Sequence, residues 1–170
     1  MLMRLKSTIR GISKRYRRKE NRRPHLELGE RGEQIASEFL EKLGFRIVAR
    51  NFIAPIGSDR NGRRITGEID LIAYDQSTKP FVLTFVEVKT RSSAELSLPE
   101  SAINLRKRRH ILRASRVYRR ILGVENEPYR FDIVTILINP QNEAEVKLLR
   151  GFFHDRMFRH QPVDITLGMG

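Results

Sequence analysis

The stretch Phe81-Val-Leu-Thr-Phe-Val-Glu-Val-Lys89 decides how this chain folds, because it ends an apolar run with two charged side chains. Side chains alternate faces along a strand, so Glu87 and Lys89 share a face with the apolar residues at the odd positions before them. A carboxylate and an ammonium group are costly to bury there unless they pair or bind a metal ion. The stretch therefore predicts a strand that carries a functional site.

A second stretch, Gly67-Glu-Ile-Asp-Leu-Ile-Ala-Tyr74, also places charged side chains in a largely apolar strand. Strict alternation predicts two sets of side chains on opposite faces, namely Glu68, Asp70 and Ile72 against Ile69, Leu71 and Ala73. If neighbouring strands bring Asp70 and Glu87 together, their carboxylates repel unless a cation lies between them. A hard divalent metal satisfies both, and Lys89 would then orient or deprotonate an attacking water and stabilise charge on a phosphate.

Apolar periodicity arranges the other elements around these two strands. Helical spacing predicts a helix over residues 30–43, ended by Gly44, and a longer helix over residues 99–122, ended by Gly123. Strands are expected at residues 45–52, 65–74, 81–89 and 131–138, with a weaker one at 145–149. Short connections predict an antiparallel meander for the first three strands, and the later strand needs the second helix as a crossover. The order αβββαβ predicts an α/β fold, a mixed sheet flanked by helices.

Positive charge is the strongest signal in the composition. The chain has 33 Lys and Arg against 20 Asp and Glu, a net charge of +13. Residues 4–23 hold ten basic residues and one acid, and residues 106–120 hold eight and no acid, which leaves 15 basic and 19 acidic residues elsewhere. Charge clustered in this way is typical of proteins that bind a polyanion, and it favours nucleic acid over a merely solvated surface.

Residues 1–25 form a separate basic extension. Leu2, Leu5, Ile9 and Ile12 recur at helical spacing, so the extension is expected to be either an amphipathic helix or a disordered tail. A helix of this kind would suit nucleic acid, an acidic membrane surface or a partner protein, and an Arg-rich start also resembles an organellar transit peptide. The globular domain is expected over residues 26–170.

The absence of cysteine limits which metal ions the protein could bind, and other features of the sequence bear on its location in the cell. With no thiolate in the sequence, a metal must be held by oxygen or histidine, which favours Mg²⁺ or Mn²⁺. The sequence has no apolar run long enough to span a membrane and no secretory signal pattern. A cytoplasmic location is the expectation that fits these features.

The order of elements, with Asp70 and the Glu87-Val-Lys89 stretch ending two apolar strands, resembles the PD-(D/E)XK nuclease superfamily. Further matches narrow the resemblance to the YraN-like family of small bacterial proteins, regarded as endonucleases related in fold to archaeal Holliday-junction resolvases. They are Gly29-x-x-Gly32-Glu33, Asn51, Gly67-Glu68-Ile69-Asp70, Glu87-Val88-Lys89-x-Arg91, Lys107 and Arg130-Phe131-Asp132. The resemblance implies Asp70 and Glu87 as metal ligands, Lys89 as the catalytic lysine and Glu33 as a helper carboxylate.

Around Lys107 the match to the family pattern is looser, with Ser115 in place of an expected Ala, and this chain departs from the pattern at two further places outside the implied metal site. The basic extension before Leu26 has no counterpart, and the connection from Asn51 to Gly67 is longer than usual. Several acids and bases also have simpler structural interpretations. Glu33 suits the first turn of a helix, Glu68 suits a salt bridge to a basic neighbour, and Arg130 with Asp132 suits a structural ion pair.

Besides an RNA-associated protein that uses the basic extension of residues 1–25, two hypotheses follow from the residues and the resemblance together. The first is a Mg²⁺- or Mn²⁺-dependent endonuclease that hydrolyses phosphodiester bonds, with DNA favoured over RNA as partner. The second is a nucleic-acid-binding or DNA-processing accessory protein that keeps the fold without cutting. Phosphate contacts are expected from basic residues on the third strand and the second helix, namely Arg91, Arg106, Lys107, Arg109, Arg113 and Arg116.

Overall fold

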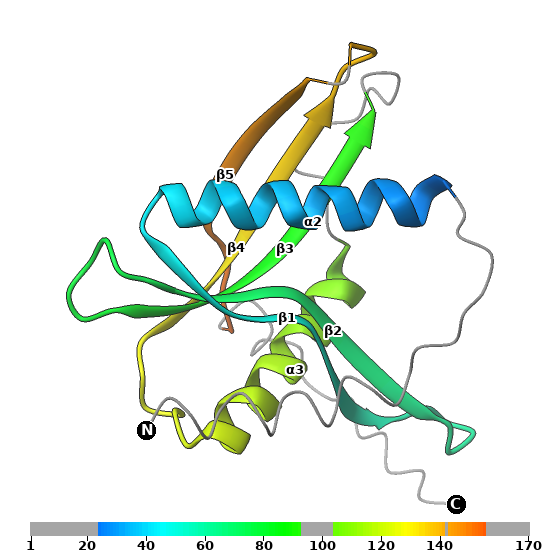
Figure 1. Cartoon of the computed structure of the whole chain (residues 1–170). Helices are drawn as coiled ribbons and strands as arrows, with labels where there is room; N and C mark the ends of the chain where they lie inside the picture. The colour runs from blue at the N-terminus through cyan, green and yellow to red at the C-terminus, as the bar shows by residue number, and fades with distance from the viewer. Residues whose placement is uncertain (1–23, 93–103, 142, 156–170) are drawn as a thin grey trace, which may run out of the picture.

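A computed structural model describes residues 24–92, 104–141 and 143–155 of the chain (Figure 1). The elements follow in the order α2 (Pro24–Lys42), β1 (Phe45–Ser58), β2 (Arg64–Asp75), β3 (Val82–Ser92), α3 (Leu105–Leu122), β4 (Tyr129–Ile138) and β5 (Ala144–Phe153). The five strands form one sheet in the order β1-β2-β3-β4-β5. The predicted α/β fold with a mixed sheet flanked by helices is therefore confirmed.

Strand directions follow the lengths of the connections. β1, β2 and β3 are antiparallel neighbours, as expected for a meander, and β4 pairs antiparallel with β5. β3 and β4 run parallel, with Glu87 beside Ile133 and Lys89 beside Thr135. Parallel neighbours need a crossover, and α3 supplies it. The prediction that the second helix would link the meander to the next strand is confirmed.

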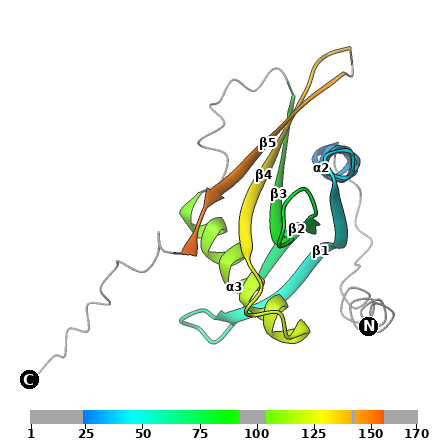
Figure 2. The same ribbon diagram turned by 90° about the vertical axis from the view of Figure 1, so that its left-hand side faces the viewer.

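The two helices cover opposite faces of the sheet (Figure 2). On one face, α3 buries Ile111, Ala114 and Tyr118 in a cluster that includes Phe52 of β1 and Phe85 of β3. The Tyr118 ring meets the rings of Phe52 and Phe85 edge-on, with centroids 5.1 and 5.9 Å away. On the other face, α2 buries Ala36 and Leu40 among Leu71, Ala73, Val86 and Val134. Both faces are apolar because helices cover both.

The sheet forks between β2 and β3. Their pairing begins at Asp75–Val82 and ends at Leu71–Val86, so the half of β2 before Leu71 pairs only with β1. Beyond the fork, β3 stays with β4 while β1 and β2 continue as a two-stranded ribbon, which projects past α3 in both views (Figures 1 and 2). Asp70 and Glu87 are the first residues beyond the last β2–β3 pair.

Strict alternation along β2 fails at this fork. Ile69 belongs to the same cluster as Ile72, on the α3 face, whereas Leu71 and Ala73 belong to the α2 face. The prediction that Ile69 shares a face with Leu71 was therefore wrong. The physical reason is that the two halves of β2 sit in different surroundings, since one is held between two strands and the other follows β1 alone.

A buried charge network closes the opposite end of the sheet. Arg130 of β4 donates from Nη2 to Asp75 of β2 at 2.6 Å and from Nε to both carboxylate oxygens of Asp132, at 3.0 and 2.9 Å. Asp132 also accepts from the Gly151 backbone N–H of β5 at 2.8 Å. Both acids are fully buried. The structural interpretation of the Arg130 and Asp132 pair is confirmed, and the network ties β2, β4 and β5 together where β2 and β3 remain paired.

The element bounds differ from the sequence predictions at both helix starts and at the end of β1, which runs to Ser58 instead of residue 52. α2 begins at Pro24, earlier than the predicted residue 30, and residues 1–23 of the predicted extension lie outside the described residues. α3 begins at Leu105 instead of residue 99, because Asn104 is its N-cap and its side chain accepts from the Lys107 backbone N–H. A turn that contains Asn61 and Gly62 joins β1 to β2, with Ser58 and Arg64 as the last pair of the two strands. β5 extends to Phe153, whose ring stacks on Phe131.

Helix α2 approaches β3 closely at Gly32. A methyl group added to Gly32 would lie 1.7 Å from Thr90 Oγ1 and 2.9 Å from Thr90 Cβ, both far inside contact distance. Arg50 of β1 fastens the same helix by donating to Gln34 and to the buried hydroxyl of Ser37. The position of α2 beside the fork therefore depends on a glycine, which explains one glycine of the Gly29-x-x-Gly32-Glu33 motif.

We expect Gly32→Ala to lower the free energy of unfolding by about 1–3 kcal/mol, as overpacking does. Gly29→Ala is the matched control, because it lies one turn earlier on the same helix and an added methyl group there meets nothing within 4 Å. That variant should gain up to about 1 kcal/mol from helix propensity. Urea unfolding of both variants measures the difference, and equal stabilities would contradict the close contact.

Candidate active site

Asp70 bridges the fork with its side chain. Its Oδ2 accepts a hydrogen bond of 2.7 Å from the backbone N–H of Val88, the residue between Glu87 and Lys89. That N–H lies beyond the last β2–β3 pair, so a carboxylate replaces the missing strand partner. This bond fixes Asp70 beside Glu87 across the fork, which is the juxtaposition expected from the sequence.

Glu87 is the buried centre of the site. Only 2% of its side chain is exposed, and two ammonium groups flank it, with Lys89 Nζ 3.4 Å from Oε1 and Lys107 Nζ 3.1 Å from Oε2. Within the described part of the chain, Oε2 has no directed hydrogen bond, so its contact with Lys107 is an ion pair of imperfect geometry. A buried carboxylate oxygen of this kind retains the capacity to accept another ligand.

The electrostatics of Glu87 reflect this crowding. Burial of its carboxylate, and next the negative charge of Asp70, raise the pKa of Glu87 to about 7, although Lys107 and Lys89 act in the opposite direction. Burial by itself lowers the pKa of Lys107, but the charges of Glu87 and Asp70 outweigh it and the pKa is raised. The negative charges of Glu87 and Asp70 are therefore unfavourable at this site, because the two lysines neutralise them only in part.

Glu33 reaches the site from α2. Burial raises the pKa of Glu33, a hydrogen bond with the Asn51 side chain acts against it as the second-largest effect, and the charges of Asp70 and Glu68 add to the rise. Asn51 lies in β1 between the pairs Arg50–Leu71 and Phe52–Ile69, with a φ of 49° that asparagine tolerates better than most residues. The structure therefore brings Glu33 to the same group of acids as Asp70, and Asn51 orients it.

Glu68 completes the acidic group on the ribbon side. Its side chain is largely exposed, yet the atoms around its carboxylate, and next the charge of Asp70, raise its pKa, while Lys107 lowers it. The charge of Lys107 acts on Glu68, but the ion pair that Lys107 forms is with Glu87, so the salt bridge expected for Glu68 stays a prediction. Sequence reasoning grouped Lys107 with the phosphate-binding residues, whereas the structure places it half-buried against Glu87. The signal that pointed to this position was its place on the same helical face as Ile111 and Tyr118.

The donor set suits a hard cation held in part by water. No three Asp, Glu or His side chains in the described residues stand close enough together to form a complete metal site. Mg²⁺ usually keeps several waters and takes only one or two carboxylates from the protein, and Mn²⁺ prefers the same oxygen ligands. The buried Oε2 of Glu87 and the Asp70 carboxylate are the two oxygen donors that fit such an ion.

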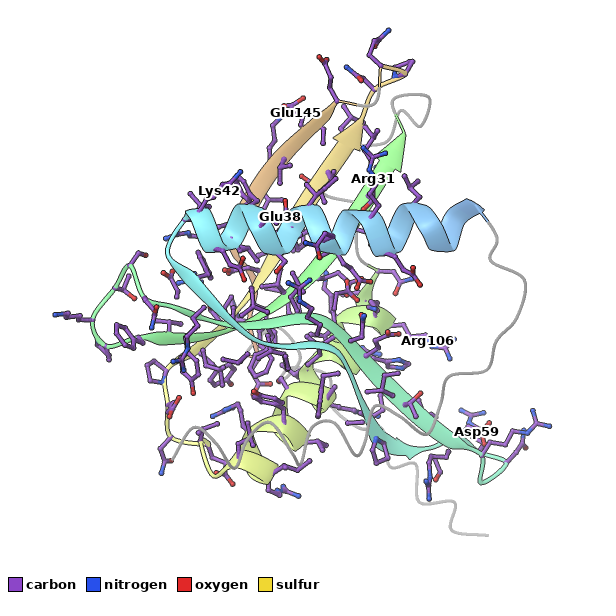
Figure 3. The ribbon with its side chains drawn as sticks, in the orientation of Figure 1. Arg31, Glu38, Lys42, Asp59, Arg106 and Glu145 are labelled. Atoms are coloured by element: carbon purple, nitrogen blue, oxygen red, sulfur yellow. The ribbon has the colours of Figure 1, made fainter. Side chains whose placement is uncertain are left out.

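The arginines of α3 have different surroundings. Arg106, Arg109, Arg113 and Arg120 are exposed, and Arg106 points outward from the start of the helix (Figure 3). Arg108 stacks over Phe152, Arg119 stacks over Tyr129, and Arg116 donates from Nη2 to both carboxylate oxygens of Asp155 at 2.7 and 3.0 Å. Burial, then Arg106 and Arg113, lower the pKa of His110, which lies between these two arginines on the helix.

The residues expected to contact phosphate differ in their exposure and in their ion pairs. Arg106, Arg109 and Arg113 lie on the exposed part of α3, next to the turn that carries Lys107. Arg91 is half-buried near the end of β3, two residues after Lys89. Arg116 is held by Asp155 and Lys107 by Glu87, so neither presents a free cation in this arrangement. None of the helices that the structure describes is long and apolar enough to span a membrane.

Fold and site together define a class: an α/β protein whose mixed five-stranded sheet forks at a buried carboxylate flanked by lysines. Comparison with known proteins is consistent with one family. The model of the uncharacterised protein family UPF0102 matches residues 32–136, a span that contains the acids and lysines at the fork, namely Glu33, Glu68, Asp70, Glu87, Lys89 and Lys107. This chain belongs to the UPF0102 family.

Its relatives are proteins of similar size to the matched region. A UPF0102 protein of Symbiobacterium thermophilum is 40% identical over 127 residues, which cover 75% of this chain and 96% of the relative. A UPF0102 protein of Caldicellulosiruptor saccharolyticus is 37% identical over 128 residues, covering 75% and 97%. These matches establish the family, and an activity does not follow from the family description.

The raised pKa of Glu87 predicts a pH dependence of stability. Because its folded value of about 7 exceeds its ordinary value of 4.5, the folded state binds the proton more tightly than the unfolded state between these limits. The free energy of unfolding should therefore fall as pH rises from 4.5 through 7, and Glu87→Gln should remove that part of the fall. Urea unfolding at pH 5 and pH 8 without divalent metal measures it.

Glu145→Gln is the control for this pH experiment, because Glu145 forms an exposed pair with Lys147 and lies on a different strand. It should leave the wild-type pH dependence unchanged. An identical fall in wild type and Glu87→Gln would show that Glu87 does not titrate in this range.

Proposed function

We propose that this protein is a metal-dependent endonuclease that hydrolyses phosphodiester bonds in nucleic acid, with DNA favoured. The observation that carries the proposal is the buried Glu87 carboxylate, whose Oε2 has no directed hydrogen bond from the residues that the structure describes, while Val88 fixes Asp70 beside it. Two carboxylates held together at a strand fork, with lysines around them, form the arrangement that the PD-(D/E)XK resemblance implies. The exposed arginines of α3 lie next to it.

Asp70 and Glu87 would hold the Mg²⁺ or Mn²⁺ ion between them. When bound, the cation supplies Lewis-acid polarisation of the phosphate and neutralises charge that develops on it. The two acids otherwise repel each other, as the raised pKa of Glu87 reflects. Glu33, which reaches the group from α2 and is oriented by Asn51, would act as a helper carboxylate.

Lys89 would act on the reacting atoms. Its ammonium lies 3.4 Å from Glu87 Oε1 and 36% of its side chain is exposed, so it borders both the carboxylate and the solvent side. From there it would orient the attacking water and stabilise the negative charge that grows on the phosphate. Hydrolysis adds the water oxygen to phosphorus and breaks the bond to the leaving sugar oxygen, which takes up a proton.

Lys107 would balance the charge of Glu87 when no cation is present. It lies 3.1 Å from Oε2, the oxygen proposed as a metal donor. A cation bound at Oε2 would compete with the ammonium for the same oxygen, and the released Lys107 would be available to a phosphate. This arrangement reconciles its position against Glu87 with the expected contact to nucleic acid.

The same ion pairs favour a second candidate function, a nucleic-acid-binding protein that does not cut. Lys89 and Lys107 already compensate the charge of Glu87, so the acid can be a buried structural anion that joins β3 to α3. On this alternative the basic surface alone acts, and metal binding at Asp70 and Glu87 is not required. The two functions differ in what metal ions do.

Metal titration and cleavage distinguish these functions. We expect Asp70→Asn and Glu87→Gln to abolish calorimetric Mn²⁺ binding and to stop cleavage of duplex, single-stranded, flapped and four-way DNA. Lys89→Met should keep Mn²⁺ and DNA affinity, while the cleavage rate falls about 10²- to 10³-fold, as for loss of one charge-stabilising group. Glu145→Gln, a change in an exposed ion pair, is the control and should behave as wild type.

Wild-type Mn²⁺ affinity in both carboxylate variants would show that the metal site is wrong. DNA binding without cleavage of any substrate, in Mg²⁺ or Mn²⁺, would favour the non-catalytic alternative. RNA counterparts of the same substrates, included in the panel, test the preference for DNA.

The arginines of α3 give a further prediction. Arg113→Ala should weaken binding to every DNA sequence alike and flatten the plot of log K against log salt by about 0.9, as expected for one lost phosphate contact. Arg116→Ala removes the same charge from the same helix, but its guanidinium is already paired with Asp155, so its effect should be clearly smaller. Fluorescence anisotropy across a salt series measures both, and equal slopes would contradict the assignment.

A further inference from the structure

The ribbon of β1 and β2 beyond the fork carries a basic tip. Three arginines, Arg60, Arg63 and Arg64, lie within five consecutive positions, and all are exposed. None of their side chains forms an ion pair with another residue in the described part of the chain. The nearby acid, Asp59, directs its carboxylate to the turn itself and accepts from the backbone N–H groups of Asn61 and Arg63 at 2.9 and 2.8 Å.

The tip is held in one shape before any partner binds. The backbone N–H of Asp59 donates to Arg63 O at 2.8 Å, the N–H of Gly62 donates to Asp59 O at 3.0 Å, and Gly62 has a φ of 74°. A rigid turn presents its side chains at a smaller entropy cost than a flexible loop. Figure 3 shows Asp59 at the end of the ribbon, at the border of the molecule and away from the sheet.

Packing against α3 fixes the direction of the ribbon. A methyl group added to Gly67 would lie 2.7 Å from His110 O and 3.1 Å from the Ala114 side chain, so β2 runs tightly along the helix there. Ala54 and Ile56 of β1 join the core cluster on the same face. The ribbon is therefore anchored next to Lys107 and His110 and projects from there as a rigid arm.

The length of the arm can be compared with a duplex. Six residues separate Asp70 from Arg64, and a strand rises about 3.3 Å per residue, so the tip lies about 20 Å from the carboxylates. Phosphates along one DNA strand are spaced about 3.4 Å apart along the axis, so this distance corresponds to about six nucleotides. A two-stranded ribbon also fits the major groove of B-DNA, whereas the major groove of A-form RNA is too narrow to admit side chains.

We propose that the arm formed by residues 54–68 binds double-stranded DNA beside the reacting phosphate, with Arg60, Arg63 and Arg64 on backbone phosphates about six nucleotides away. This inference rests on the proposed function for the identity of the reacting phosphate. It deepens that function by naming the substrate class, since contacts about 20 Å from the reacting phosphate favour a partner that stays extended over that distance, as a stiff duplex does.

The test is a binding experiment that does not depend on cleavage. The variant Arg60→Ala/Arg63→Ala/Arg64→Ala removes three charges from the arm, and Lys42→Ala/Arg46→Ala/Lys79→Ala removes three exposed charges from segments at the opposite end of the molecule (Figure 1). Anisotropy with a labelled 24-base-pair DNA duplex in EDTA gives affinity over a salt series. The same labelled strand alone and an RNA duplex of the same sequence are the comparison ligands, and thermal unfolding verifies that both variants fold.

We expect the arm variant to lose at least about tenfold in duplex DNA affinity at 0.1 M salt, and its salt slope to flatten by about 0.9 for each lost contact. The control variant should change much less, and single-stranded DNA and duplex RNA should be affected less than duplex DNA. Ethylation interference should place the arm-dependent phosphates about six nucleotides from any cut made by the wild-type protein in Mn²⁺.

Equal losses in both variants would mean that only the overall charge matters, which would contradict the proposal that the arm binds DNA. No loss in either variant, or no DNA binding by the wild-type protein, would contradict it as well. A loss that is as large for single strands would exclude the duplex assignment, and a larger loss for RNA would exclude DNA. If duplex binding depends on the arm but no substrate is cleaved, the endonuclease proposal fails while the arm stands.

Discussion

The fork between β2 and β3 is the constraint on which the rest of this structure depends. Pairing stops at Leu71–Val86, and the next backbone N–H that faces the gap, from Val88, is taken by the carboxylate of Asp70. A side chain thus replaces a strand, and the replacement places Asp70 beside Glu87. The fork also releases the first half of β2 to follow β1 alone, so the same departure from regular pairing creates both the acidic site and the projecting ribbon.

Helices on both faces bring the remaining groups to the fork. Gly32 allows α2 to approach Thr90, which lets Glu33 join the acids, and Gly67 allows β2 to lie along α3, which lets Lys107 reach Glu87. The opposite end of the sheet is closed by Arg130 with Asp75 and Asp132. In that network the acids accept hydrogen bonds from Arg130, whereas Glu87 Oε2 has no directed hydrogen bond among the described residues.

The folded structure determines which of the basic residues are available to a partner, and the net charge alone does not show this. A count along the sequence treats every arginine of α3 as equivalent, but aromatic rings and Asp155 engage three of them. Conversely, Arg60, Arg63 and Arg64 do not stand out in the count, because Asp59 is their neighbour in sequence. Asp59 turns to the backbone of its own loop, so the tip is more basic than its composition indicates. Positive charge available to a partner is a property of the folded surface.

The sequence by itself determined the α/β fold, the antiparallel meander, the crossover helix and the pairing of Arg130 with Asp132, because these follow from apolar periodicity, connection length and local alternation. It also marked Asp70, Glu87 and Lys89, since charged residues ending apolar strands are recognisable without coordinates. Only the tertiary structure decided that Ile69 changes face at the fork, that Asn51 orients Glu33 and that Lys107 lies against Glu87. Each of these depends on contacts between segments far apart in the chain, and neither spacing nor residue type encodes them.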